Sequence, residues 1–219
     1  MKRVINFAIF DVIIVILWAV LLGGSYALTK LAYDAGATGV WVVPSALLSG
    51  FLVLCLMGLL LPRPAMGKHN RAGKQAFYWY VQFQFSRIWH YHPIYHFVFS
   101  IGLLRFLFLR SCGGKVAFSS SISSFADLHD PYCLTIGPGA IIGMHATLTG
   151  HFIVGDVIVV GPLVIGEDSL VGAFSIIGPR VTIGKGCLIE GKCEFFPGSV
   201  LADGQRLTKG TELRKAVAP

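Results

Sequence analysis

The stretch Ile165-Gly-Glu-Asp-Ser-Leu-Val171-Gly-Ala-Phe-Ser-Ile-Ile177-Gly-Pro-Arg-Val-Thr-Ile183-Gly184 repeats an aliphatic residue followed by glycine every six positions. The same register continues downstream, with an aliphatic or aromatic residue at each step, at Ile189, Phe195 and Leu201. Self-similarity at a fixed short period is the sequence signature of a solenoid, in which each repeat forms one strand and one turn. Three hexads make one triangular coil, so residues about 18 apart stack at strand spacing, ~4.8 Å.

The repeat also extends upstream, with two irregular steps. One residue is missing between Ile165 and an earlier register, which comprises Ile136, Ile142, Leu148, Val154 and Val160. A third register begins at Val116 and Ile122 and is separated from Ile136 by two extra residues. Four residues after each aliphatic position we expect a second inward site, mostly small: Ala140, Ala146, Phe152, Ile158, Ser169, Ser175, Val181, Cys187, Cys193 and Ser199. The pattern predicts a parallel β-helix domain over residues 113–204, with about four coils, and a C-terminal tail over 205–219.

The first half of the chain has a different character. Hydrophobic residues make up 54% of the 219 residues and charged residues only 13%, with a mean hydropathy of +0.69. Two apolar segments, Val4–Leu28 and Val40–Leu61, each match the ~20 residues that span a bilayer as a helix. We therefore expect a transmembrane helix hairpin over residues 1–63. A signal peptide is the alternative for the first segment, and Asp11 within it is either functional or placed at headgroup depth.

Residues 64–112 form a third region, in which aromatic residues alternate with polar ones up to a break at Pro93. Aromatic, His and Arg side chains favour the bilayer interface, so we expect an amphipathic, interfacial helical region with two helices around Pro93. His90, His92 and His96 leave a metal site open as an alternative, although no Cys or carboxylate lies beside them in the sequence.

The charge distribution constrains topology and partners. Residues 1–112 hold ten Lys/Arg against two acids, whereas residues 113–219 hold eight against nine. Because the basic excess belongs to the hydrophobic half, it indicates membrane topology and anionic lipid, and the neutral repeat domain argues against nucleic acid. Lys2-Arg3 flank one end of the helix pair and Arg63, Lys68, Arg71 and Lys74 flank the other, while the loop between has only Lys30. This pattern predicts a multi-pass protein of the cytoplasmic (inner) membrane with its β-helix on the cytoplasmic side.

The five cysteines contain no CxxC pair and fit reduced thiols.

From Leu104 to Gly204 the sequence resembles the hexapeptide-repeat acyltransferases, which implies a left-handed parallel β-helix, a homotrimer and a thioester donor. Ala146-Thr-Leu-Thr-Gly-His151 is similar to the Gly-His element of galactoside and maltose acetyltransferases. The closest resemblance is to the membrane-bound C-terminal modules of poly-lysine-synthetase-type proteins. It lies in Gly113-Gly-Lys-Val116, Asp130-Pro-Tyr-Cys-Leu-Thr-Ile-Gly137, Thr149-Gly-His151 and Gly161-Pro-Leu-Val-Ile-Gly166.

The resemblance implies His151 as general base, for which an imidazole is suited because its pKa lies near neutral pH. Counting hexads places Asp130 and Asp168 beside His151, where a carboxylate would orient the imidazole; both are ordinary turn residues in the alternative interpretation. His129 is a weaker candidate, and His145 lies one hexad away, on a neighbouring face. We expect no metal; a zinc site of the γ-carbonic-anhydrase type is the alternative, and its histidine spacing is not reproduced by His145 and His151.

For the donor, the resemblance implies backbone contacts at Ala173 and Gly191 and phosphate contacts at Lys185 and Lys192. The Thr-Lys pair of the soluble acetyltransferases is replaced by Phe196-Pro197, and their long loop after the Gly-His element is missing. No tightly bound cofactor is expected; the donor substrate is a coenzyme A or acyl-carrier thioester.

Taken together, these features predict a membrane α plus all-β protein that moves an acyl group to a hydroxyl or amine of a lipid or lipid-linked acceptor. Its expected partners are itself as a homotrimer, membrane lipid and the acyl-thioester donor, without nucleic acid. Two alternatives stay open: a non-catalytic, membrane-tethered trimeric scaffold, suggested by the apolar run after His151, and an amide-bond-forming module as in poly-amino-acid synthesis.

Overall fold

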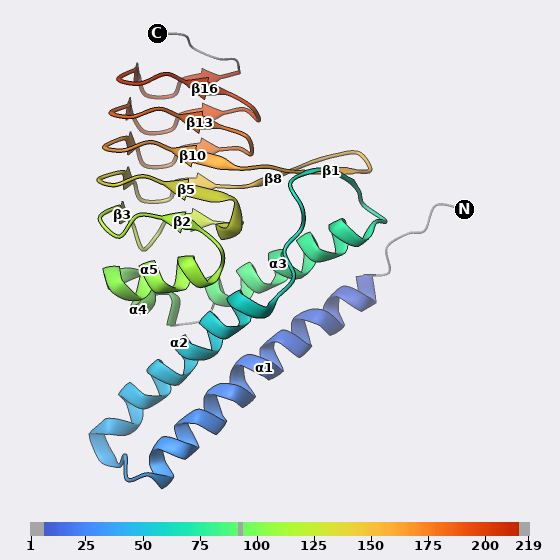
Figure 1. Cartoon of the computed structure of the whole chain (residues 1–219), viewed down its shortest axis with the longest axis vertical. Helices are drawn as coiled ribbons and strands as arrows, with labels where there is room; N and C mark the ends of the chain where they lie inside the picture. The colour runs from blue at the N-terminus through green and yellow to red at the C-terminus, as the bar shows by residue number, and fades with distance from the viewer. Residues whose placement is uncertain (1–6, 92–93, 215–219) are drawn as a thin grey trace.

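The computed structural model describes residues 7–91 and 94–214, and side chains from residue 12 onward. Lys2, Arg3, His92 and Pro93, and the side chain of Asp11, which entered the sequence predictions, lie outside the described part. Figure 1 shows a stack of short parallel strands above a layer of helices, with two long helices slanting away below that layer.

The β-helix has three faces of five parallel strands each. The first face contains β2 (Lys115–Val116), β5 (Leu134–Ile136), β10 (Leu163–Ile165), β13 (Thr182–Ile183) and β16 (Val200–Leu201). The second face contains β3 (Ser121–Ile122), β6 (Ile141–Ile142), β11 (Leu170–Val171), β14 (Leu188–Ile189) and β17 (Arg206–Leu207). The third face contains β4 (Asp127–Leu128), β7 (Thr147–Leu148), β12 (Ile176–Ile177), β15 (Glu194–Phe195) and β18 (Glu212–Leu213).

This architecture confirms the parallel β-helix predicted from the hexads and fits the left-handed form expected for them. Regular coils stack at an 18-residue interval, as in the pairing of Ile165 with Ile183. The domain is longer than predicted, because β17 and β18 add a fifth coil beyond residue 204, within the segment expected to be a tail. The aliphatic register continues there at Leu207 and Leu213, but Thr208 and Arg214 replace the small residue that follows in most of the earlier hexads, so the repeat is less evident in the sequence.

The interior is filled as the pattern predicts. The aliphatic residues of each hexad and the small residues four positions later are buried, including Ser169, Ser175 and Ser199, each at most 1% exposed. The inward hydroxyls are satisfied by the next coil. Ser169 Oγ donates to the Gly184 carbonyl at 2.6 Å and accepts from the Cys187 amide at 3.0 Å. All five cysteines are free.

Two predicted interior positions are wrong. Phe152 is 44% exposed and Val154 is 57% exposed. Both belong to an antiparallel hairpin, β8 (His151–Val154) and β9 (Val157–Val160), which leaves the coil instead of continuing it. The Gly161 amide donates to the Gly150 carbonyl at 2.8 Å, so the coil closes across the base of this hairpin. Ten residues therefore leave the coil after Gly150, at the point where the sequence lacks the long loop of the soluble acetyltransferases.

The helical half contains α1 (Phe7–Asp34), the short 3-10 helix η1 (Gly39–Trp41), α2 (Val42–Leu60), α3 (Lys74–Tyr91), α4 (Ile94–Ser100) and α5 (Gly102–Ser111). In the described residues, Val12–Asp34 and Gly39–Leu60 are long and apolar enough to cross a membrane, as predicted. The pair α4–α5 is bent by 111° and is a third candidate span or a re-entrant pair. The region before the β-helix thus has three helices, one more than predicted.

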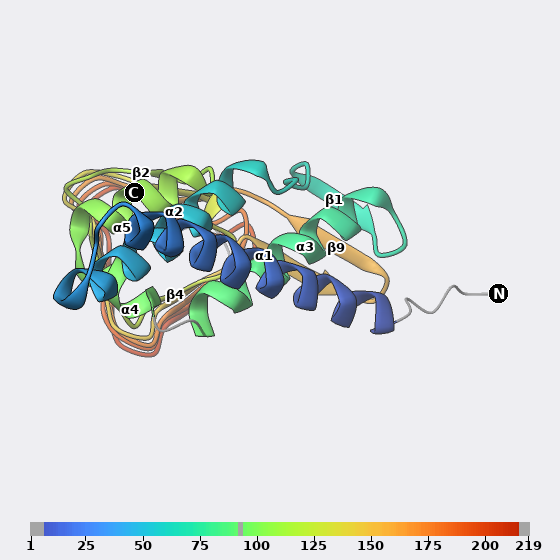
Figure 2. The same cartoon turned by 90° about the horizontal axis from the view of Figure 1, so that it is seen from below.

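The helices α3, α4 and α5 form a layer between the helix pair and the β-helix. Figure 1 shows α3 between the hairpin above it and α1 below it, and Figure 2 shows α4 and α5 beneath the end of the coil stack. Two arginines attach this layer. Arg63 donates to the carbonyls of Gly58 and Ser111, and Arg105 donates to those of Phe99, Ser120 and Ile122. Because each guanidinium satisfies carbonyls from two separate elements, the layer is joined firmly to α2 and to the first coil.

The linker after α2 adds a third strand to the hairpin. β1 (Gly67–Asn70) pairs antiparallel with β9, so the small sheet has the order β1-β9-β8. Residues of this sheet, of α3 and of the turn before β5 form a separate buried cluster: Ala76, Trp79, Tyr132, Cys133, Ile158 and Val160. The hairpin is therefore held between a strand from the membrane half and α3, which fixes the position of its first residue, His151.

Candidate active site

The site forms at the corner where the third face of the β-helix turns into the first face. Both irregular steps of the repeat fall there. The two extra residues after Leu128 are taken up in the segment that contains Asp130 and the three-residue 3-10 turn η2 (Pro131–Cys133), and the hairpin begins at His151. The irregularities therefore bring together two residues that regular coils would keep apart.

His151 and Asp130 are in direct contact. His151 Nδ1 lies 2.6 Å from Asp130 Oδ2, with the imidazole 16% exposed and the carboxylate fully buried. The carboxylate only accepts hydrogen bonds, so Nδ1 carries the hydrogen and the Nε2 lone pair is left at the opposite side of the ring. Nε2 has no partner in residues 7–91 and 94–214. This arrangement is suited to taking a proton from a substrate group.

Three further donors satisfy the buried carboxylate. The Gly150 amide donates to Oδ2 at 3.0 Å, Thr149 Oγ1 lies 3.5 Å from the same atom, and the Tyr132 hydroxyl donates to Oδ1 at 2.9 Å. A charge buried in this way is stable only when paired and hydrogen-bonded. Burial, and then the nearby Asp130 carboxylate, raise the pKa of Tyr132 well above its ordinary value, so Tyr132 remains a donor.

Gly150 allows this close approach. A Cβ at this position would lie 2.4 Å from Cβ of Cys133 and 3.1 Å from Cβ of Asp130. Any side chain would therefore force the 3-10 turn and the Thr149–His151 segment apart. The glycine of the Gly-His element thus has a structural reason: it brings the backbone next to the carboxylate that orients the histidine.

Helix α3 covers the imidazole. The Trp79 ring lies 4.8 Å from the His151 ring, and the Phe83 ring lies 6.0 Å from it, edge-on. The sequence did not assign these aromatic residues to the site. Their i, i+4 spacing was the available signal, but it was attributed to the bilayer interface. Trp79 and Phe83 of α3 thus pack on His151.

The second predicted carboxylate lies elsewhere, and its placement beside His151 was wrong. Asp168 sits at the corner between the first and second faces, where its amide donates to the Pro138 carbonyl and its side chain abuts Gly139. The hexad count treated residues 151–160 as part of the coil, whereas they form the hairpin. Asp168 has a positive φ of 53° and takes the turn role given as the alternative.

The residues proposed for the donor lie at two different corners. Ala173, Gly191 and Lys192 come together between the second and third faces, where the Lys192 amide donates to the Ala173 carbonyl at 2.9 Å. Lys185 lies at the corner of Asp168 and pairs with Glu167 at 3.3 Å. The structure thus groups three of these four residues and separates Lys185 from them.

The remaining histidines divide between the site and its surroundings. His129 lies beside His151, with the rings edge-on and their centroids 6.4 Å apart. His145 lies at the corner between the second and third faces, between Phe125 and Phe174. Within residues 7–91 and 94–214, no three His, Cys, Asp or Glu side chains are arranged to hold a metal ion.

Comparison with known proteins supports the hexapeptide repeat. Residues 162–196 match the family model described as bacterial transferase hexapeptide (six repeats). No curated protein sequence matches the chain. The match confirms the hexapeptide repeat of the transferase kind and supports an acyltransferase; the closer likeness to poly-lysine-synthetase-type modules remains a prediction.

Among solved structures, serine acetyltransferase from Neisseria gonorrhoeae in complex with serine is 14% identical, with 100% of this chain and 98% of that chain covered and a TM-score of 0.31. Serine acetyltransferase isoform 3 from Entamoeba histolytica is 14% identical over 89% of this chain and 69% of that chain, with a TM-score of 0.30. A hexapeptide transferase family protein from Anaplasma phagocytophilum is 22% identical over 48% of this chain and 75% of that chain, with a TM-score of 0.20. Likenesses of this strength carry no information about substrate.

Proposed function

We propose that this chain is a membrane-bound acyltransferase in which His151 is the general base and Asp130 orients it. The acyl group moves from a coenzyme A or acyl-carrier thioester to a hydroxyl or amine of a lipid or lipid-linked acceptor. The observation that carries the proposal is the 2.6 Å contact between His151 Nδ1 and Asp130 Oδ2, which leaves Nε2 available.

The reaction needs one proton acceptor that later becomes a proton donor. Nε2 of His151 takes the proton from the acceptor hydroxyl or amine as its oxygen or nitrogen attacks the thioester carbonyl carbon. The tetrahedral intermediate then collapses, the carbon–sulfur bond breaks, and the imidazolium returns the proton to the departing thiolate. Asp130 stabilises the imidazolium between these two steps, which is the role of the carboxylate in comparable dyads and triads.

The helical half supports a membrane substrate. Trp79 and Phe83 of α3 pack on His151, and α3 also packs against α1, which contains the first candidate span. A single helix therefore contacts both the base and a segment suited to the bilayer. With both termini on the cytoplasmic side, as the Lys/Arg distribution predicts, the site would face the cytoplasmic leaflet. Reporter fusions at the C-terminus and in the loop after α1 test this orientation.

The donor would bind along the corner formed by Ala173, Gly191 and Lys192, as the family resemblance implies. In the homotrimer that the family resemblance implies, the sites would lie between neighbouring β-helices. Lys185 is paired with Glu167 at another corner, so it becomes the least favoured of the donor residues.

A trimeric scaffold is the second candidate. The exposed apolar side chains Phe152 and Val154, 44% and 57% exposed, favour it, because they give the hairpin a surface for another protein. This interpretation assigns no role to the buried pair of His151 and Asp130. Transfer activity that depends on His151 would exclude it as the principal function.

The experiment uses the full chain in liposomes made from a total lipid extract, with radiolabelled acetyl and long-chain acyl thioesters as donors. The wild type is expected to label a lipid, and His151→Ala to lower the rate by roughly 10²–10⁴, the usual contribution of a general base. Arg214→Ala, at the end of the last coil, where the side chain pairs with Glu212 and stacks on Phe196, is the matched control and should keep the wild-type rate. Equal labelling by wild type and His151→Ala would remove the catalytic assignment.

A further inference from the structure

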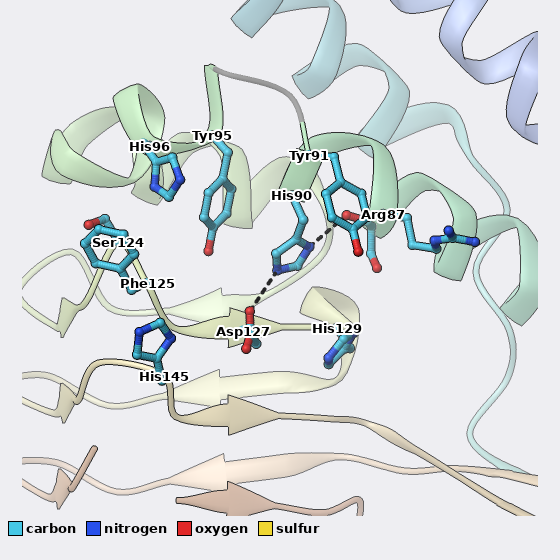
Figure 3. Close-up of a pocket in the computed structure, with 11 residues that line it drawn as sticks. Arg87, His90, Tyr91, Tyr95, His96, Ser124, Phe125, Asp127, His129 and His145 are labelled. Atoms are coloured by element: carbon cyan, nitrogen blue, oxygen red, sulfur yellow. Dashed lines mark hydrogen bonds and ion pairs between the residues drawn. The ribbon is translucent and has the colours of Figure 1, made fainter. Parts of the chain in front are cut away.

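A pocket of about 380 Å³ lies beside the site, between the helical layer and the lowest coils of the third face (Figure 3). The helices α3 and α4 form one wall and the loops and strand around β4 form the other. Its lining residues are Ser86, Arg87, His90, Tyr91, Tyr95, His96, Ser124, Phe125, Asp127, His129 and His145. Neither the hexapeptide repeat nor the proposed chemistry at His151 explains this group of side chains.

His90 presents an unsatisfied acceptor in this pocket. Its Nδ1 lies 2.8 Å from the Ser86 carbonyl, which only accepts, so Nδ1 carries the hydrogen. Burial is the main cause that lowers the pKa of His90 to about 4. The ring is therefore neutral near pH 7, and its Nε2 atom carries a lone pair that can accept a hydrogen bond. Nε2 is buried without a hydrogen-bond partner in the described residues.

A second acceptor faces the first. Asp127 Oδ1 lies 4.0 Å from His90 Nε2, and Figure 3 shows the two side chains directed at one another across the pocket wall. A carboxylate oxygen and an imidazole lone pair have no hydrogen to share between them. Two acceptors at this separation are satisfied when a group that carries a hydrogen lies next to them.

Ser86 adds an independent observation. Its side chain is 1% exposed, it lines the pocket, and Oγ has no hydrogen-bond partner among the described residues. A buried hydroxyl without a partner costs free energy, and such groups are rare in native proteins. His90 Nε2 therefore faces Asp127 Oδ1 in the pocket, and Ser86 Oγ is a second buried polar atom without a hydrogen-bond partner among the described residues that line it.

His129 connects this pocket with the base. Its ring stacks on His90 with centroids 5.8 Å apart and meets His151 edge-on at 6.4 Å. A molecule in the pocket is therefore separated from His151 by the width of one imidazole. The same pocket is bounded by α3 and α4, so its occupant would also lie beside the membrane half.

We propose that this pocket holds the hydroxyl-bearing headgroup, a sugar or another polyol, of the lipid acceptor. This inference rests on the proposed function and names its acceptor class. Hydroxyl groups donate to the acceptors His90 Nε2 and Asp127 and accept from Ser86, and aromatic walls such as Tyr91, Tyr95 and Phe125 suit the apolar face of a sugar ring. A phosphate offers mainly acceptors, so it does not satisfy the lone pair of His90 Nε2 or the carboxylate of Asp127 that faces it.

The test measures lipid retention, without any transfer reaction. The full chain is reconstituted in phosphatidylcholine liposomes that contain, as a minor component, monoglucosyl diacylglycerol, phosphatidic acid or phosphatidylethanolamine. After extraction and purification in detergent, the retained lipids are quantified by mass spectrometry. The glucosyl lipid is expected to be enriched several-fold over its share of the liposome, and the other two lipids are not.

Two variants locate the retention. Asp127→Asn replaces an acceptor oxygen with an amide, and Ser124→Trp fills the pocket with a bulky side chain; both should abolish the enrichment. Arg214→Ala, in the last coil, is the matched control and should retain it. Preferential retention of phosphatidic acid or phosphatidylethanolamine, no enrichment, or enrichment that survives both pocket variants would each overturn the proposal.

The failure of this inference is distinguishable from failure of the proposed function. His151→Ala should keep the enrichment, because His151 does not line the pocket. Enrichment without any transfer by the wild type would contradict the proposed acyltransferase and leave the pocket assignment standing. Transfer that depends on His151, with no lipid enrichment, would overturn the pocket assignment alone.

Discussion

His151 Nδ1 lies 2.6 Å from Asp130 Oδ2, although 21 positions separate the two residues in the sequence. Regular coils stack residues 18 apart, so a regular repeat would not create this contact. The 3-10 turn Pro131–Cys133, which takes up the two extra residues, places Asp130 directly before it, and the hairpin that leaves the coil begins with His151. The pair is therefore built from the two departures from the repeat, while the regular coils supply the rigid support.

Replacing Asp130 with Asn should lower kcat by roughly 10²–10⁴ and leave the fold intact. The amide has nearly the shape of the carboxylate, but it neither stabilises the imidazolium nor fixes the hydrogen on Nδ1. Steady-state kinetics of lipid acylation measure the effect. Asp168→Asn is the matched control, because Asp168 lies at a different corner and should give wild-type kinetics. Equal losses in both variants would contradict the assignment of Asp130.

The stability of the chain should fall on acidification because of His90. Burial lowers its pKa from the ordinary value of 6.5 to about 4, so between these values the unfolded chain binds more protons than the folded chain. The free energy of unfolding is therefore highest above pH 6.5 and decreases as the pH falls towards 4, by up to about 1.4 kcal/mol per pH unit. Burial also lowers the pKa of His129, which acts in the same direction.

Chemical unfolding in detergent at pH 7 and pH 5 measures this dependence. His90→Gln should lose less stability between the two pH values than the wild type, because Gln does not titrate. An identical loss in the variant and the wild type would show that His90 does not contribute.

Gly172→Ala should destabilise the β-helix by about 1–3 kcal/mol, the cost of overpacking an interior that cannot adjust. A Cβ at Gly172 would lie 2.5 Å from the Gly191 amide nitrogen and from the Glu190 carbonyl carbon, both in the backbone of the next coil. Thermal unfolding monitored by circular dichroism measures the change. At Gly102, in the first turn of α5, a Cβ would meet only the end of the Arg105 side chain at 3.8 Å, so Gly102→Ala should have almost no effect. Equal melting temperatures of the two variants would contradict the close stacking at Gly172.

Most of the fold could be predicted from the regular hexads. An aliphatic residue every six positions requires a coil with three equal sides, and burial of Ile165, Val171 and Ile177 follows directly from it. The same pattern failed at Phe152 and Val154 for a physical reason. Side chains alternate along a strand with a period of two, and two divides six, so an antiparallel hairpin rich in apolar residues satisfies a six-residue register without being part of the coil.

The candidate site was predicted in part. The irregular steps in the repeat located Asp130 and His151 together, since any break in a stacked coil must form a turn or an excursion at a corner. The contribution of α3 was not predictable from its pattern. Trp79 and Phe83 are spaced so that both lie on one aromatic face of a helix. Such a face can lie in the bilayer interface or pack against a histidine ring of the protein. Only the position of α3 in the fold distinguishes them.

The most direct test of a base oriented by a carboxylate is a double-variant cycle on lipid acylation. The rates of wild type, Asp130→Asn, His151→Ala and the double variant are compared under identical donor and lipid conditions. If Asp130 acts through His151, the double variant should be as slow as His151→Ala alone, because groups that act as a unit are strongly non-additive. A double variant whose loss equals the product of the two separate losses would show that Asp130 and His151 act independently, which would contradict the account.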